Sequence, residues 1–596
     1  MVKRFAMELI ASLTNRFMIN QYMVKLIAII GFSFLFQPLF AQFTTESVLN
    51  QGQFIKISVK EAGVYKIDYN WLQSNGVTGS IPSDGIRVFG HGGQMLPEDN
   101  SVQRFDDLRE NSIWMEDGGD GTFGQGDYFL FYAPGQDTWA YDESRGYFRM
   151  KKNIYEDAAY YLIQLDGSNG LRIPARETIA NTGTPSQQFM DHQRLEEDKV
   201  NLLGKDAIQQ GSGKQWFGDE ISNTRTVYYP DFFSFPNILT DQDAYLESTF
   251  AGRCAVSSRF EIELDQQTFS QRVSSTNLSY QNTYARNATL EETFLASEDR
   301  IPVRVNYDQV SSPSQGWLDY VQINAWRQTK FDNDPLLVKD PRSLTTDKYG
   351  FEFSGNTGAM TIWDVTEPTR TIQQNLSSST PNSFYYEADT LRQFYVFNRN
   401  THTLIPDYLG EIENQNLHGI LDLDMLIVYH KDFEDQANRL AQHRSEFGGL
   451  IVETIDIEKI YNEFASGSAD PTAIRDFTRM LHERSPTFRF LLLFGDGSYD
   501  YRHRVRETDP QNFVPTFQSD NSLDPIYAYP SDDYFALLDR NEGSKLRGAL
   551  DIAVGRLPVR TAAEAKVIVD KIIKYETDPE LMGDWRMQLT FIADDE

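Results

Sequence analysis

The sequence predicts a multidomain chain, with a β-rich, sandwich-like amino-terminal region followed by an α/β domain built on a parallel sheet. The chain has 596 residues, too many for a single hydrophobic core. Before about residue 420, short segments that alternate apolar and polar residues are separated by Gly, Pro, Asn and Asp, which is typical of antiparallel β structure. From residue 421 onward, apolar residues recur at helical spacing between short, fully apolar runs.

The α/β part, residues 421–596, begins with a buried strand at Met425 and continues in β-α-β order. Gly448 and Gly449 end the first helix, and Asp470 caps the second, with Pro471 in its first position. This order implies right-handed crossovers and a parallel sheet. The other predicted elements are strands at 450–455, 488–494 and 587–592, a turn at 495–497, and a helix that begins at the capping box of Thr561 and Glu564.

The β-rich part, residues 42–420, is expected to contain more than one antiparallel module. Residues 54–68 alternate apolar and polar side chains around a Glu-Ala-Gly turn, which predicts a hairpin. Residues 177–223 are polar and weakly patterned, which indicates a long loop or a link between modules. Further strands are predicted at 127–132, 160–165, 259–264, 303–307 and 320–324.

Residues 1–41 are predicted to be a secretory signal peptide, because a basic start precedes an apolar core and a small-residue exit. The apolar core, residues 26–36, is too short for a comfortable membrane span, so an uncleaved anchor is the less favoured alternative. Met18 or Met23 could be the true start of the protein. The mature chain is expected to begin at Gln42.

The chain is strongly acidic, with 86 acidic and 55 basic residues and a formal charge of -31. A field of this sign disfavours nucleic acid and anionic membrane surfaces as partners. Cys254 is the only cysteine, so neither an intrachain disulfide nor a thiolate metal cluster can form, and its expected role is that of a small buried hydrophobe. An exported protein without disulfides points to a Gram-negative envelope.

Two glycine-rich loops invite a functional interpretation. Residues 90–93, Gly-His-Gly-Gly, look like a catalytic histidine loop, but they lie between β segments, where a turn that uses positive φ is favoured. Residues 116–127 are rich in carboxylates and glycines, as calcium loops are. They lack the closing glutamate and flanking helices of an EF-hand, so a solvated turn is favoured over a calcium site.

Several short motifs of the α/β part occur together. They are the Met425 strand, Leu491-Leu-Leu-Phe-Gly-Asp496, Ser531-Asp532, Val554-Gly-Arg556, Lys574-Tyr-Glu576 and residues 585–596. In these motifs, residues 424–596 resemble the first part of the gingipain-type cysteine peptidase domain, a caspase-like α/β fold. With a signal peptide and a large β region in front, the whole chain resembles the sortases of the type IX secretion system. The last strand has no helix behind it, so we expect an amino-terminal fragment with a truncated peptidase domain.

This resemblance implies that a Cys–His pair performs the chemistry and that both residues lie beyond residue 596, in the second half of the domain. Glu596 falls where gingipains carry the acid that orients the histidine, a role that fixes the imidazole tautomer. Asp594 and Asp595 crowd the same place and could substitute for it. The non-functional alternative is an acidic loop after a strand.

The chemistry implied by the resemblance requires no cofactor. Gingipain-type domains do bind calcium, so Asp496, Asp532 and Asp533 become candidate ligands of a structural calcium ion. His443 and His482 do not match the histidine motif of the family. They fall on predicted helices and are expected at the surface.

The full-length protein would be a cysteine peptidase and transpeptidase at the outer membrane or cell surface of a Gram-negative bacterium. It would remove the carboxyl-terminal sorting domain of secreted cargo and link the cargo to lipopolysaccharide, beside an outer-membrane β-barrel partner. The fragment itself is expected to be inactive. A secreted gingipain-like endopeptidase and a non-catalytic β-rich subunit of a secretion complex are the alternatives. The large β region favours the sortase, because a scaffold-bound enzyme needs docking surface.

Overall fold

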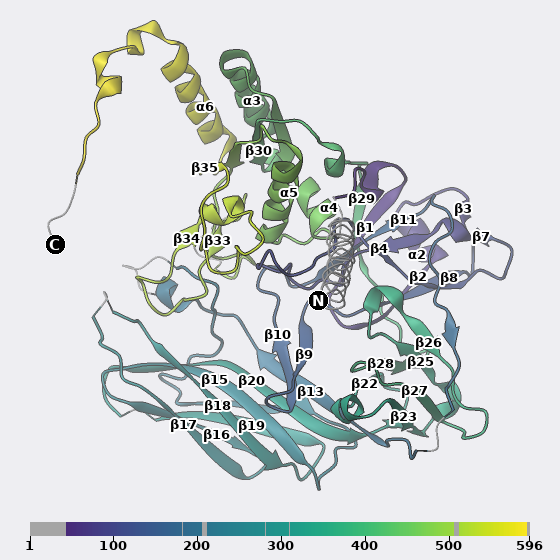
Figure 1. Ribbon diagram of the computed structural model, residues 1–596. Helices are drawn as coiled ribbons and strands as arrows, with labels where there is room; N and C mark the ends of the chain where they lie inside the picture. The colour runs from purple at the N-terminus through teal and green to yellow at the C-terminus, as the bar shows by residue number, and fades with distance from the viewer. Residues whose placement is uncertain are drawn as a thin grey trace, which may run out of the picture. The chain divides into compact units, whose positions relative to one another are not determined.

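The computed structural model describes residues 43–180, 183–205, 211–279, 282–308, 310–505 and 512–592 (Figure 1). The predicted signal peptide at 1–41 and the candidate acid Glu596 lie outside these ranges. None of the helices in the described ranges has both the length and the apolar character that a membrane crossing requires.

The first β module contains a five-stranded sheet of order β29-β1-β11-β4-β5 and a three-stranded sheet of order β2-β8-β6. One apolar cluster, which includes Ile57, Ile67 and Phe131, joins the two sheets. The elements are β1 (Phe54–Val59), β2 (Gly63–Asp68), α2 (Tyr69–Ser74), β3 (Ile81–Pro82), β4 (Arg87–Phe89), β5 (Glu110–Asn111), β6 (Trp114–Glu116), β7 (Thr122–Phe123), β8 (Tyr128–Ala133), β11 (Ala159–Gln164) and β29 (Asp407–Ile412).

The hairpin predicted at residues 54–68 is wrong, although both of its strands exist. β1 pairs antiparallel with β11 and β29, whereas β2 pairs with β8. The Glu-Ala-Gly segment therefore carries the chain from one sheet to the other. Alternation along a strand shows which face is buried, but not which neighbour supplies its hydrogen bonds.

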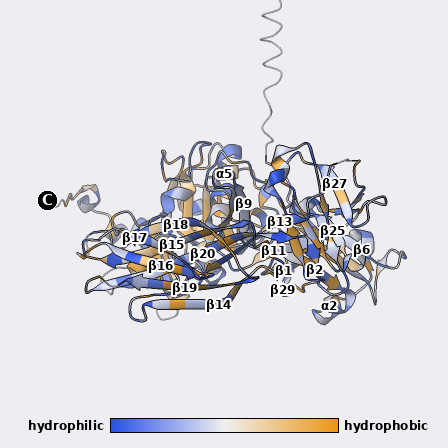
Figure 2. Ribbon diagram, turned by 90° about the horizontal axis from the view of Figure 1, so that it is seen from below, coloured by the Kyte–Doolittle hydropathy of each residue, from blue (hydrophilic) through white to orange (hydrophobic). Residues whose placement is uncertain are grey.

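The second β module is a sandwich of two antiparallel sheets, β13-β20-β15-β18 and β14-β19-β16-β17 (Figure 1). Apolar and polar residues alternate along its strands (Figure 2), and the apolar ones form a core with Phe250, Ile262 and Val305 at its centre. The strands are β13 (Gln188–Glu196), β14 (Thr226–Ser234), β15 (Asp243–Cys254), β16 (Ser258–Leu264), β17 (Gln267–Val273), β18 (Arg286–Leu295), β19 (Arg300–Asp308) and β20 (Ser314–Gln328).

The interpretation of residues 177–223 as a long loop is wrong, because β13 lies inside them. β13 pairs with β20 from Gln188 to Glu196. Its polar side chains have partners in the fold: Asp191 accepts from Arg327 at 2.5 Å, and Gln193 donates to the Ser234 carbonyl at 2.7 Å. A strand whose polar groups are satisfied by its neighbours shows no apolar alternation in the sequence.

Apart from β12, the strands of a third β module follow the sandwich in sequence. Its main sheet has the order β12-β26-β25-β28-β22, and two smaller pairs, β21-β24 and β23-β27, stand beside it. Phe351, Phe384 and Phe394 pack together in its core. The strands are β12 (Ala175–Arg176), β21 (Lys330–Phe331), β22 (Leu336–Val338), β23 (Lys348–Glu352), β24 (Ser354–Gly355), β25 (Thr361–Asp364), β26 (Ile372–Gln374), β27 (Ser383–Glu387) and β28 (Phe394–Phe397). A separate hairpin is formed by β9 (Thr138–Asp142) and β10 (Tyr147–Lys151).

The predicted parallel sheet is confirmed, with the order β31-β30-β32-β35 and parallel pairing throughout. Gly449, at φ +66°, ends α3, and the Asp470 side chain accepts from the Thr472 amide at the start of α5. Helix α3 packs with α6, and α4 packs with α5. The elements are β30 (Met425–Tyr429), α3 (Glu434–Gly448), β31 (Val452–Asp456), α4 (Ile457–Phe464), α5 (Pro471–Arg484), β32 (Phe490–Phe494), β33 (Phe517–Gln518), β34 (Pro530–Ser531), β35 (Ala553–Leu557) and α6 (Ala562–Thr577).

The strand predicted at residues 587–592 is not formed. These residues are in no strand, and Phe591 and Ile592 are 89% and 94% exposed. An apolar run becomes a strand only where a neighbouring strand completes its hydrogen bonds, and none of the described strands pairs with this one.

A buried histidine joins the first β module to the α/β domain. The side chains of His418 and Glu463 are both fully buried, and His418 Nδ1 lies 2.5 Å from Glu463 Oε1. On its other side, His418 Nε2 lies 3.3 Å from Asp106 Oδ1. The imidazole stacks on Phe464 of α4, and Glu463 also accepts from the Leu417 amide at 3.0 Å. One histidine thus links the first module, the segment before β30 and helix α4.

We expect this histidine to make stability depend on pH. Burial lowers the pKa of His418, but the hydrogen bonds to Asp106 and Glu463 outweigh burial and raise the pKa to about 9. Because an unfolded histidine titrates at about 6.5, the stabilisation is complete below about pH 6.5 and is lost as pH rises through 9. The linked free energy is on the order of 3 kcal/mol. The thermal unfolding midpoint should therefore fall further between pH 6.5 and 9 in the wild type than in His418→Gln; equal falls would contradict this role.

Candidate functional site

The carboxyl edge of the parallel sheet is the place where α/β proteins usually bind ligands, at the point where the strand order reverses. β30 has β31 on one side and β32 on the other, so the reversal lies between β30 and β32. These strands end in register at Tyr429 and Phe494. His430 and Gly495 follow them directly and flank the expected crevice.

Aromatic rings fill this crevice. The ring centroid of Phe513 lies 5.1 Å from that of His430 and 5.0 Å from that of Phe433, which in turn packs on Phe494. Gly495 makes the close approach feasible, because a Cβ at this position would lie 2.9 Å from the Cβ of Phe513. The turn predicted at 495–497 is therefore a packed corner of the domain.

Arg556 of β35 ties the loops of this edge together. Its guanidinium donates to both carboxylate oxygens of Asp532, at 2.7 and 2.8 Å. It also donates to the carbonyl oxygens of Gly495, Val514 and Pro515, at 2.8, 2.6 and 3.0 Å. The planar guanidinium suits such a convergent set of acceptors. Three of the motifs that carry the sequence resemblance, those that contain Gly495, Asp532 and Arg556, thus meet in space, where they support the scaffold.

Two of the three calcium candidates, Asp496 and Asp532, are engaged in other contacts. Asp532 pairs with Arg556, and Asp496 Oδ2 lies 2.5 Å from Arg560 Nε. Over the ranges that the structure covers, no three His, Cys, Asp or Glu residues are grouped as a metal ion requires. These contacts do not test whether calcium binds, so the structural calcium stays a prediction.

The remaining candidates lie apart from this edge. Cys254 ends β15, buried in the sandwich, with its sulfur 3.1 Å from Ser311 Oγ. His443 and His482 lie on α3 and α5 as predicted. His443 is not the expected surface residue: its side chain is 10% exposed, and its Nε2 lies 2.7 Å from Glu576 Oε2. Glu596, with Asp594 and Asp595 beside it, lies outside the described residues, so its predicted role stays a prediction.

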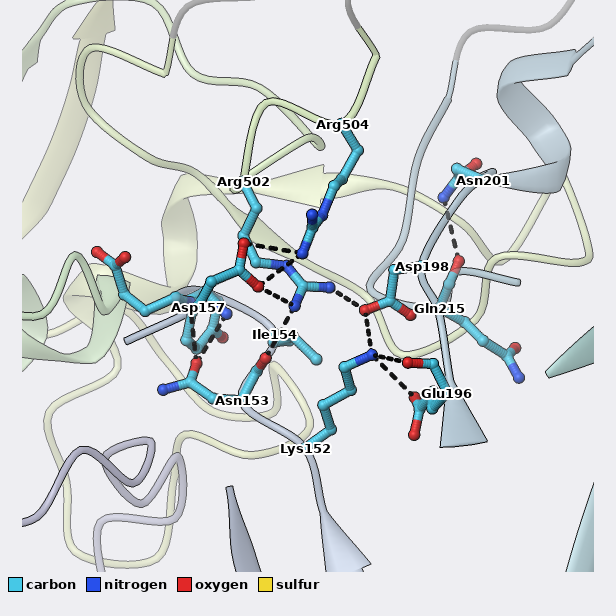
Figure 3. A network of polar contacts seen from close by, with 12 residues as sticks. Lys152, Asn153, Ile154, Asp157, Glu196, Asp198, Asn201, Gln215, Arg502 and Arg504 are labelled. Carbon is cyan, nitrogen blue, oxygen red and sulfur yellow. Dashed lines mark hydrogen bonds and ion pairs between the residues drawn. The ribbon is translucent and has the colours of Figure 1, made fainter. Parts of the chain in front are cut away.

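A polar network that the sequence did not reveal fixes the β32–β33 loop to the β modules (Figure 3). Arg502 and Lys152 both pair with Asp198, which follows β13, and Lys152 Nζ lies 2.9 Å from Asp198 Oδ2. Arg502 and Arg504 also pair with Asp157, at 3.1 and 2.6 Å. Basic residues at 502 and 504 in so acidic a chain are the one signal that could have indicated this contact.

Burial decides how strong these pairs are. Asp198 and Arg502 side chains are each 6% exposed, whereas Asp157 is 56% exposed. Burial raises the pKa of Asp198, but the charges of Lys152 and Arg502 outweigh burial and hold the pKa below its usual value. Asp198 is therefore the member of the network whose loss would leave the most charge uncompensated.

We expect Asp198→Asn to loosen the β32–β33 loop. The substitution leaves Arg502 and Lys152 buried without their shared carboxylate, at a cost on the order of 3 kcal/mol. Hydrogen exchange of residues 499–505 should accelerate accordingly. The matched control Asp157→Asn removes an exposed carboxylate and should cost less than about 1 kcal/mol. Similar exchange in the two variants would show that the network does not hold the loop.

Comparison with known proteins identifies the family of the α/β domain and a similar fold for the chain. Residues 421–596 match the model of Peptidase family C25. The crystal structure of dimeric latent PorU from Porphyromonas gingivalis is similar to this chain with a TM-score of 0.78 at 25% identity, over 93% of this chain and 52% of that chain. The chain thus spans about half the length of that PorU chain. No curated protein matches the sequence.

Two carbohydrate-binding modules also match parts of the chain. They are the CBM36-1 domain of a xylanase from the hindgut metagenome of Trinervitermes trinervoides (10% identity, 22% of this chain and 96% of that chain, TM-score 0.14) and the CBM6 of LamC from Zobellia galactanivorans (17% identity, 16% and 70%, TM-score 0.12). TM-scores this low do not show a shared fold.

The family model and the PorU structure are the informative matches. Residues 421–596 are therefore a Peptidase family C25 domain, of the gingipain family, in a chain whose fold is similar to that of PorU.

Proposed function

We propose that the full-length protein is a cysteine peptidase and transpeptidase that acts as a sortase of the type IX secretion system. The observation that carries this proposal is the union of a C25 domain with β modules in an arrangement similar to PorU. In the proposal, the enzyme removes the carboxyl-terminal sorting domain of secreted cargo. It then links the cargo to lipopolysaccharide at the cell surface, beside an outer-membrane β-barrel partner.

The proposed reaction has two steps. A cysteine thiolate attacks the carbonyl carbon of the scissile peptide bond, the C–N bond breaks, and a histidine protonates the departing amine of the sorting domain. An amine of the acceptor then attacks the thioester and gives up a proton to the histidine, an amide bond forms, and the thiolate leaves. Water in place of the amine would give hydrolysis.

The described residues supply a scaffold for this reaction. The only cysteine of the chain, Cys254, is buried in the sandwich and lies outside residues 421–596, which match the C25 family. We therefore place the nucleophile and its histidine outside residues 1–596, with Glu596 as the acid that orients the histidine. Arg556 and the Asp198 network hold the sheet edge and the β32–β33 loop in a fixed geometry.

A cargo reporter tests the proposal directly. The full-length protein is incubated with a reporter that carries a sorting domain, with and without an added primary amine, and the products are weighed by mass spectrometry. A reporter joined to the amine supports the transpeptidase. Hydrolysis alone at any amine concentration favours the secreted endopeptidase, and an unchanged reporter favours a non-catalytic subunit.

We expect Cys254→Ser to leave the activity of the full-length protein unchanged. The thiol of Cys254 is buried against the Ser311 hydroxyl and is not placed to meet a substrate. Serine preserves the size and the hydrogen bond, so kcat/KM should stay within about twofold of the wild-type value, a difference of under ~0.5 kcal/mol in the barrier. A loss of activity with a normal thermal unfolding midpoint would identify Cys254 as the nucleophile.

A further inference from the structure

A cavity of about 340 Å³ is lined by residues of the β9–β10 hairpin, β13 and β22, together with residues of neighbouring loops. Lys339 and His192 line it, together with Trp139, Gln136, Gln393 and one acidic residue, Asp137. Cavities that hold small organic ligands begin at about 300 Å³. The size of this one is therefore sufficient for a compact ligand.

Lys339 brings an ammonium group to this cavity without a hydrogen-bond acceptor. The residue is 1% exposed, and its Nζ has no hydrogen-bond partner among the described residues. Nζ lies 4.0 Å from the ring centroid of Phe148, so a cation–π contact stabilises part of the charge. An aromatic face accepts no strong hydrogen bond, and the N–H groups of a buried ammonium remain costly when they lack acceptors.

The carboxylates nearest in sequence are already engaged. Asp340 accepts from Arg342 Nε at 2.9 Å and from the Tyr349 hydroxyl at 2.7 Å. Asp191 accepts from Arg327 at 2.5 Å. Asp137, which also lines the cavity, accepts from the Asn153 amide at 2.8 Å. The fold thus pairs these acids with other donors and leaves Lys339, at the cavity lining, without a hydrogen-bonded acid among the described residues.

His192 also lacks hydrogen-bond partners. Its ring stacks on Trp139 with centroids 3.9 Å apart, and both of its ring nitrogens are buried without a partner among the described residues. Burial lowers the pKa of His192 well below its usual value, so the ring is neutral. A neutral imidazole has one N–H donor and one acceptor, and a hydroxyl group can satisfy either.

We propose that this cavity binds a small hydroxylated carboxylate, such as an acidic monosaccharide, with its carboxylate on Lys339 and its hydroxyl groups on His192. The carboxylate supplies the acceptors that the buried ammonium lacks. The indole of Trp139 and the amides of Gln136 and Gln393 suit the faces and hydroxyl groups of a sugar ring. Burial lowers the pKa of Lys339 to about 7, and an anion beside it would favour the charged form.

The first test is binding of D-glucuronate to the full-length protein, measured by isothermal titration calorimetry. D-glucose has similar hydroxyl groups without the charge, acetate has the charge without hydroxyl groups, and inorganic phosphate is a different anion. We expect saturable binding of glucuronate that exceeds the binding of each of the other three. Equal binding of glucose, or tighter binding of phosphate, would overturn the assigned ligand class.

The Lys339→Met variant tests whether Lys339 binds the ligand or has only a structural role. Methionine keeps most of the volume and removes an unpaired buried charge, so the variant should unfold at the same temperature or higher. It should bind glucuronate at least about tenfold more weakly, the loss of one charge-assisted hydrogen bond. Lys348→Met, on β23 outside the cavity, is the control and should bind as the wild type does. Undiminished binding in Lys339→Met would overturn the site.

Carbamylation by cyanate gives an independent readout if the heat of binding is small. A neutral amine reacts with cyanate, and glucuronate in the cavity should both charge and cover Lys339. Mass spectrometry of the digested protein should therefore show that glucuronate slows modification at Lys339 and leaves Lys348 unaffected. An unprotected Lys339 at saturating glucuronate would contradict the proposal.

Discussion

A charge removed from water is costly unless an opposite charge lies beside it, and the arrangement of this protein depends on that cost. Asp198 meets Arg502, and His418 meets Glu463, each across a boundary between the β modules and the α/β domain. Such pairs contribute little net stability over apolar packing, but a wrong arrangement of the modules would leave the charges uncompensated. Buried polar contacts therefore specify one docking geometry, whereas the apolar cores stabilise each module by itself.

Local structure could be predicted from the sequence where one segment contains all the relevant information. The apolar run at β30, the glycine after α3 and the aspartate cap of α5 need no distant partner. Pairing is different, because β1 and β2 resemble a hairpin and yet join separate sheets. β13 was missed for the related reason that its polar side chains are satisfied by residues far away in the sequence.

In the candidate site, too, the residues could be predicted from the sequence but their contacts could not. The residues of the Ser531-Asp532 and Val554-Gly-Arg556 motifs could be found from the sequence, and a family resemblance could be attached to them. Their role could not be predicted from the sequence, because Arg556 donates to carbonyl oxygens of two other segments, at Gly495 and at Val514 and Pro515. The aromatic filling of the crevice likewise depends on Phe513, which the fold places beside His430. The unpartnered nitrogens of Lys339 and His192 are visible only once burial is known.

The pairing of β1 with β29 has a consequence for how the chain folds. Phe54 lies opposite Ile412, so the edge strand of the first sheet comes from the far end of the β-rich region. A chain that emerges amino terminus first must keep β1 half-paired until the intervening modules have appeared. Contacts so distant in sequence form slowly, and an open strand edge is prone to pair with other chains. The early folding intermediates of this protein are therefore the species that a holding chaperone would most need to protect.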